Sequence, residues 1–315
     1  TGKLDYDAKI TPAISLIKAI RLLSIDAVLR AENGEVNQAL EECRSGIRFC
    51  SKLLDEPVLL DTLIALAVRK VVQISFDRIA SGKGLDPETL ARWVKDMDPG
   101  PWRSRFVRCL SGERALGLEV ALETIKNPRA MRDFFGKDSP RGITAWLIRP
   151  LLKTQTLWVF KRYADVEKIS GQPYYRQREL LQKLSEKTSA LAWYMKPLGY
   201  FFPDYTSVFL KEASLEAMMR TARAGLACKI YKSKTGRYPD TLDALVPDFL
   251  SEAPMDPFTG EPLVYKIANG ELLIYSLGSN QKDDGGRMTY EITKIIMEKD
   301  DDWTWRERIQ ETPKK

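Results

Sequence analysis

The candidate side chains for acid–base catalysis in this sequence are carboxylates. The chain has no histidine, and histidine is the usual general base near neutral pH and the commonest transition-metal ligand. The candidate acid pairs on predicted helices are Glu41 with Glu42 and Glu113 with Glu119. Acid pairs on amphipathic helices are mostly surface charge. No glycine-rich phosphate loop, nucleophile elbow or zinc motif occurs in the sequence, which favours a protein without enzymatic activity.

A further acidic cluster lies near the end of the chain, in the segment SLGSNQKDDGG at residues 276–286. Asp283 and Asp284 are adjacent there, Asn280 precedes them and two glycines follow. Glycine adopts positive φ without strain, and Asx residues hydrogen-bond to their own backbone. By itself this pattern predicts a polar turn.

The charge balance and the cysteines limit which functions and bonds we expect. The 49 Lys and Arg exceed the 43 Asp and Glu by six, and this small excess is spread along the chain, so we do not expect nucleic-acid binding. The four cysteines form no CxxC pair. Cys43 and Cys50 lie about 10 Å apart along one predicted helix, too far to bridge each other, so we expect buried free thiols.

The most apolar run, residues 58–80, is interrupted by Asp61, Arg69, Lys70 and Asp77. Such charges are not expected together in a bilayer-spanning helix, and the run is predicted to be a core helix. The sequence begins at Thr1 without a methionine, as expected either for the trimming of a longer precursor or for an engineered start. Any export signal or membrane anchor is therefore expected upstream of Thr1.

Apolar residues at three- and four-residue spacings predict that residues 5–205 are almost wholly helical. The expected helices lie at about 10–29, 36–54, 58–80, 88–97, 103–125, 143–169, 176–194 and 207–232. Asp86 is predicted to cap the helix that follows it, and the last helix is predicted to be amphipathic. Four arginines are expected to form a solvated helix face: Arg103, Arg105, Arg108 and Arg114.

The first hairpin, VLRAENGEVNQALEECRSGI, resembles a tetratricopeptide-type unit, with Gly34 at its turn. The aromatic segment 195–205 is a candidate linker. Four more aromatic residues lie close to it in the sequence: Tyr174, Tyr175, Trp193 and Tyr194. Together these side chains either pack between the two parts of the chain or line a ligand groove.

The last part of the sequence has β-type patterns and turns in place of the helical pattern. A short helix is expected at 241–249, and strands at 262–267 and 271–276 flank the tight turn Asn269-Gly270. The fold class predicted from the whole sequence is α+β, predominantly α. An all-helical domain at 1–205 precedes an α+β domain at 206–315, which has a long helix and an antiparallel sheet.

The order of segments in the second domain is similar to that of a known protein family. A long helix precedes TGRYPDTLDAL, PMDPFTGEPLVY, a hairpin and YSLGSNQKDDGG. This order resembles the carboxyl-terminal part of the major pseudopilins of type II secretion, over about residues 207–290. The upstream helices resemble uncharacterised envelope-associated proteins of bacteria with the same ending. The phenylalanine-initiated apolar helix that anchors and polymerises pseudopilins does not occur in this chain.

The resemblance implies a calcium site in the loop after the hairpin, where the polar turn is the alternative. The matching positions are Leu277, Gly278, Asn280, Asp283 and Asp284. Calcium takes six to eight oxygen ligands, so two carboxylates, an amide, loop carbonyls and water would suffice.

The expected function is that of a non-enzymatic scaffold or interaction protein of the bacterial cell envelope, related to secretion or pili. The expected location is periplasmic or envelope-associated, with protein partners there. The alternative is a carboxylate-based hydrolase that acts on carbohydrate or peptide in a groove of the helical domain, where two acids would lie about 5 to 10 Å apart.

Overall fold

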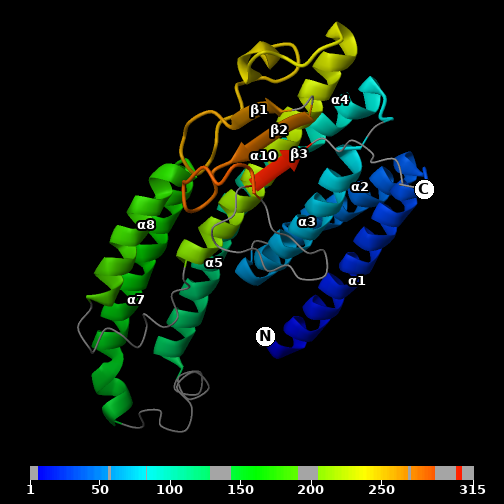
Figure 1. Cartoon of the computed structure of the whole chain (residues 1–315). Helices are drawn as coiled ribbons and strands as arrows, with labels where there is room; N and C mark the ends of the chain where they lie inside the picture. Colours follow the sequence, from blue (N-terminus) through cyan, green and yellow to red (C-terminus); the bar gives the residue numbers. More distant parts are fainter. Residues whose placement is uncertain are drawn as a thin grey trace.

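The computed structural model describes residues 6–55, 58–82, 84–127, 143–190, 205–268, 271–287 and 303–306. These residues form a mostly helical protein with one small antiparallel sheet (Figure 1). The described part of 6–190 contains helices and turns and no strand, which confirms the helical prediction there. Three predicted features lie outside the described residues: most of segment 195–205, the pair Trp193 and Tyr194, and the turn Asn269-Gly270.

The first three helices pack on one another at one side of the molecule (Figure 1). Helix α1 (Tyr6–Glu32) and α2 (Val36–Leu53) form the predicted hairpin, and α3 (Leu59–Ala80) packs against both. Gly34 has a φ of +93° at the hairpin turn, a conformation that favours glycine. The tetratricopeptide likeness of this unit stays a prediction.

Helix α4 (Pro87–Asp96) begins as the sequence predicts. The side chain of Asp86 accepts a hydrogen bond from the Thr89 amide at 2.8 Å, and Pro87 occupies the first turn, where its missing N–H costs nothing. The end of α4 leads directly into α5.

Helices α5 (Gly100–Lys126) and α7 (Ile143–Ser170) lie side by side, and their far ends extend away from the other elements (Figure 1). Helix α8 (Tyr174–Ser189) packs beside α7. The arginines of α5 are only partly the solvated face that the sequence predicts: Arg108 is exposed, but Arg103, Arg105 and Arg114 are partly buried. Arg105 donates to the carbonyl of Ser51 and Arg108 to that of Leu54, so both tie α5 to the end of α2.

Helix α10 (Tyr205–Thr235) passes through the middle of the molecule, between the sheet and the other helices (Figure 1). The sequence predicts an amphipathic helix here, and the structure shows something different. Residues 212–219 are all buried, and eight consecutive residues cover every side of a helix with 3.6 residues per turn. Polar residues of α10 therefore lie inside the protein.

The sheet has the order β1-β2-β3 and is antiparallel throughout. Strands β1 (Val264–Ala268) and β2 (Glu271–Ser276) confirm the predicted pair. Strand β3 (Trp303–Arg306) was not predicted; it places Trp305 opposite Ile274. A 3-10 helix, η3 (Leu242–Leu245), stands at the predicted short helix.

One hydrophobic cluster runs through most of these elements. It joins Phe76 and Trp93 of α3 and α4 to Leu226 of α10 and to Ile274 and Trp305 of the sheet. The predicted division into 1–205 and 206–315 stays a prediction, and buried side chains from both parts belong to this cluster. All four cysteines are free and buried, as predicted.

The closest contact between α10 and the sheet depends on a glycine. A Cβ atom at Gly225 would lie 2.4 Å from the indole ring of Trp305, a side chain that is 1% exposed. The indole thus rests directly on the backbone of α10.

Replacing Gly225 by alanine is therefore expected to destabilise the protein by about 1 to 3 kcal/mol, the usual cost of overpacking a core. Denaturant unfolding measures this. Gly117→Ala is the matched control, because its Cβ would lie 3.6 Å from Tyr163, an ordinary contact, and alanine is the better helix former by about 1 kcal/mol. Equal stability of the two variants would contradict the packing shown here.

Candidate functional site

The predicted calcium loop follows β2 and is held to the sheet by a buried carboxylate. Asp256 is 2% exposed. Its side chain accepts hydrogen bonds from the Ser276 hydroxyl at 2.8 Å and from the amides of Leu277 and Phe258 at 2.7 and 2.8 Å. Burial raises the pKa of Asp256, and these donors oppose the rise because they favour the charged form. Asp256 thus fixes the start of the loop.

The five predicted calcium ligands lie in one loop, but their two carboxylates form hydrogen bonds with different groups. Asp283 accepts hydrogen bonds from the Tyr275 hydroxyl at 2.6 Å and from the Gly285 amide at 2.9 Å. Asp284 accepts one from the side-chain amide of Asn280 at 2.8 Å. The two carboxylates are therefore engaged separately.

A lysine competes for the same carboxylate. Lys266 on β1 lies 3.3 Å from Asp283, and both side chains are about half exposed. The hydroxyl of Tyr275, the Gly285 amide and Lys266 all lower the pKa of Asp283, because they stabilise its charged form. A cation that bound Asp283 would have to displace the ammonium group of Lys266.

The loop backbone is curled in the way the glycines predict. Positive φ values occur at Gly278 (+65°), Gln281 (+58°), Gly285 (+76°) and Gly286 (+72°). The carbonyl of Gly278 accepts from the Gln281 amide at 3.3 Å. In the described ranges no three His, Cys, Asp or Glu side chains gather closely enough to hold a metal ion. Calcium at this loop would therefore depend on carbonyl oxygens and water as well as on the two carboxylates.

The structure contains a buried charge cluster that sequence reasoning missed. Glu212 and Glu216, one turn apart on α10, are each 2% exposed. Glu216 pairs with Arg103 of α5 at 3.2 Å and with Arg220 of α10 at 2.5 Å. Arg103 also donates to the carbonyl of Gln172. The sequence signal was the i, i+4 pair Glu216 and Arg220, which on an exposed face would be unremarkable.

Glu212 differs from Glu216 because its Oε1 atom is buried without a hydrogen-bond partner. Burial, and then the charge of Glu216, raise the pKa of Glu212 from 4.5 to about 8. Glu212 is therefore mainly protonated at neutral pH, since an unpaired buried charge is costly.

The acid pairs considered for catalysis do not form a catalytic dyad. Glu113 accepts the Leu59 amide at 2.6 Å and so caps α3, whereas Glu119 is exposed. Glu41 pairs with Arg44 at 2.5 Å and Glu42 with Arg30 at 3.0 Å. Each of these paired acids has a structural partner.

Of the two interpretations of the aromatic residues, packing or a ligand groove, the described residues Tyr174 and Tyr175 fit packing. Tyr174 is buried and meets Phe258 edge-on, with ring centroids 5.2 Å apart. The ring of Tyr175 lies against Gly260, where a Cβ would approach it to 2.9 Å.

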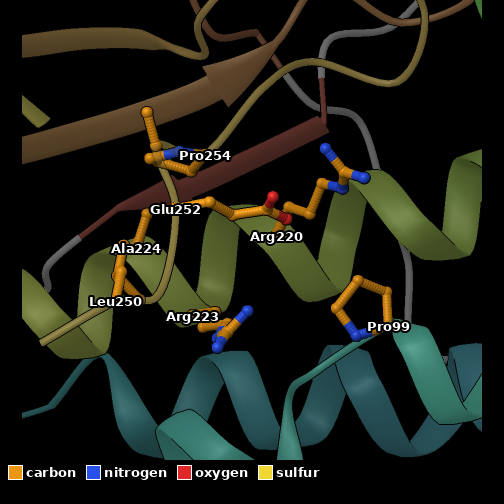
Figure 2. A pocket seen from close by; sticks show the side chains of 8 residues that line it. Pro99, Arg220, Arg223, Ala224, Leu250, Glu252 and Pro254 are labelled. Carbon is orange, nitrogen blue, oxygen red and sulfur yellow. The ribbon is translucent and has the colours of Figure 1, made fainter. Parts of the chain in front are cut away.

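A small cleft and an open groove occur among the described residues. One, of about 20 Å³, lies between α10 and the loop after η3, where the side chain of Glu252 extends toward Arg220 (Figure 2). That volume holds little more than one water molecule. The other is an open groove of about 450 Å³ between α2 and α4. It contains Glu41, Asp86 and Glu88, but Asp86 caps α4, and the Thr89 amide lowers its pKa, which is unfavourable for a general acid.

Comparisons with protein-family models, with curated proteins and with solved structures find no match to this chain.

The raised pKa of Glu212 predicts a pH dependence of stability. The folded state holds this proton up to about pH 8, whereas the unfolded chain loses it near pH 4.5. The free energy of unfolding should therefore fall as pH rises between these values. Glu212→Gln should remove this slope and stabilise the protein at pH 8 by on the order of 3 kcal/mol.

Urea unfolding at pH 5 and pH 8 measures the change. Burial also raises the pKa of Asp77 to about 8, so Glu212→Gln should remove only part of the total slope. Exposed Glu119→Gln is the control and should leave the slope as it is. An unchanged slope in Glu212→Gln would contradict a neutral Glu212.

Proposed function

We propose that this protein is a non-enzymatic scaffold or interaction protein of the bacterial cell envelope, related to secretion or pili, whose helical part presents surfaces to protein partners. The observation that carries this proposal is the outer face of α1. Four large apolar side chains are half or more exposed there: Ile14 (50%), Leu22 (69%), Leu23 (57%) and Leu29 (52%).

The opposite side of α1 is used by the fold. Ile20, Ala27 and Val28 are buried against α2 and α3. The four exposed side chains therefore lie outside the core, on the half of α1 that faces away from α2 and α3. Exposed apolar side chains on one side of a helix are typical of protein interaction sites.

The charges at the carboxyl-terminal end of this face are paired within the chain. Arg30 lies 2.7 Å from Asp26, 3.2 Å from Glu35 and 3.0 Å from Glu42. Lys18 is also exposed on this half of α1, but near the exposed leucines apolar contact is the main interaction that the face offers. An amphipathic helix of a partner protein has the complementary surface.

The hydrolase alternative has weaker support. It requires a cleft with two free acids. In the α2–α4 groove, Glu41 is paired with Arg44 and Asp86 serves as a helix cap.

Photocrosslinking tests the proposal in bacteria that make the full-length protein. A crosslinking amino acid at position 22 should join the protein to a discrete partner in the envelope fraction. Glu179 on α8, with a side chain 73% exposed, is the control position and should give no such product. Identical products from both positions, or none from position 22, would refute the α1 surface.

The second part of the proposal is that the loop 277–286 binds calcium through Asp283 and Asp284. Two adjacent carboxylates, the Asn280 side chain and the turned backbone of a loop anchored on Asp256 support it. Leu277 and Gly278 would supply carbonyl oxygens.

Calcium at about a hundred times its dissociation constant should then stabilise the protein by roughly 2.7 kcal/mol, an effect that chelator reverses. Asp283→Asn with Asp284→Asn should abolish the shift in melting temperature. Lys266→Gln should lower the dissociation constant, because it removes the cation that competes for Asp283. Identical melting curves in calcium and in chelator would show that the loop is only a turn.

A further inference from the structure

The outer face of α7 carries a second exposed apolar stripe. Leu147, Leu151 and Leu157 are 60%, 36% and 71% exposed. Pro150, Thr154 and Lys161 are exposed between and beyond them. With 3.6 residues per turn, these six positions share one face of the helix. We call this set the α7 face.

The other side of α7 accounts for its packing. Leu152 packs with Ile125 of α5 and with Ile148, while Tyr163 and Val166 belong to a larger core cluster. Helices α5 and α8 lie against α7, and α7 forms the outer edge of the molecule, far from α1 (Figure 1). No element that the structure describes covers the α7 face.

The charge of α7 distinguishes it from α1. Residues 143–164 include Arg149, Lys153, Lys161 and Arg162 and contain no acidic residue. Lys153 and Lys161 are exposed beside the leucines. Arg162 turns back to Trp158, with its guanidinium 5.5 Å from the ring centroid, and pairs with Asp165 at 2.9 Å. The exposed flank of the stripe is thus positive.

This charge pattern selects among possible occupants. In an antiparallel pair of α7 helices centred on Leu157, Lys153 of each copy would face Lys161 of the other, and like charges repel. An anionic lipid surface instead matches both features, because leucines enter the headgroup boundary and lysines meet lipid phosphates. None of the described helices has the length and apolar content needed to cross a bilayer.

We propose that the α7 face docks this protein on anionic membrane surfaces, with Leu147, Leu151 and Leu157 inserted at the headgroup boundary and Lys153 and Lys161 on lipid phosphates. This surface is separate from the α1 surface and does not depend on it.

Co-sedimentation of the full chain with lipid vesicles tests the proposal. The protein should bind vesicles that contain phosphatidylglycerol and not vesicles of phosphatidylcholine alone. Raising the ionic strength from about 0.05 to about 0.5 M should weaken binding, because salt screens exposed charges. Equal binding to both vesicle types, or none to the anionic vesicles, would overturn the proposal.

Substitutions on α7 and α1 show which surface binds the vesicles. Leu157→Glu should reduce the partition coefficient more than tenfold, whereas Leu22→Glu on α1, an equally exposed leucine (69% against 71%), should leave it unchanged. Lys153→Gln with Lys161→Gln should reduce it by about fivefold for each charge removed. Lys18→Gln with Lys52→Gln removes the same charge elsewhere and should have a smaller effect.

All altered side chains are exposed, and unchanged circular dichroism and melting would show that the variants are folded. Sedimentation equilibrium without lipid tests whether a second copy of this chain, and not a membrane, covers the α7 face. A dimer that Leu157→Glu dissociates would assign the α7 face to a second copy and overturn the proposal. Loss of the position-22 crosslink with retained vesicle binding would affect only the proposed function.

Discussion

Eight consecutive buried residues, 212–219, leave no side of α10 facing water along two turns, and much of the structure depends on this. A helix enclosed in this way needs partners all around it, and α3, α4, α8, β2 and β3 supply them. Its polar side chains must also be satisfied inside the protein. Arg103 and Arg220 neutralise Glu216, and Glu212 holds a proton instead. The charge state of the interior is therefore set by packing.

The burial of α10 also limits which parts of the protein other molecules can contact. The interior around α10 is filled, and the cleft beside it measures about 20 Å³. Large exposed apolar side chains occur on α1 and α7, at two edges of the molecule (Figure 1), and α7 also carries exposed lysines. The acidic loop is a third feature, held by Asp256 but exposed at its acidic end.

Much of the local structure could be predicted from the sequence, because it depends on neighbouring residues. The spacing of apolar side chains located the helices between 6 and 190, Asp86 with Pro87 located a helix start, and Gly34 located a turn. The β-rich runs located β1 and β2. The absence of histidine from these 315 residues meant that none of them could serve as a histidine base or histidine metal ligand. For the loop at 277–286, composition correctly predicted a polar turn with glycines at positive φ.

The tertiary structure decided which side chains meet, because those contacts join residues far apart in the chain. Trp305 rests on Gly225, Arg103 reaches Glu216, and Asp256 holds the amide of Leu277. None of these pairs has a local sequence signal. The burial of α10 could not be predicted from the sequence either. Glu216 and Arg220 at i, i+4 spacing favour a solvated face, and only the fold brings Arg103 of α5 to Glu216. Within the loop, sequence named the carboxylates, but only the fold placed Lys266 and Tyr275 against Asp283. Local propensity thus determined the elements, and long-range packing and electrostatics determined what each element faces.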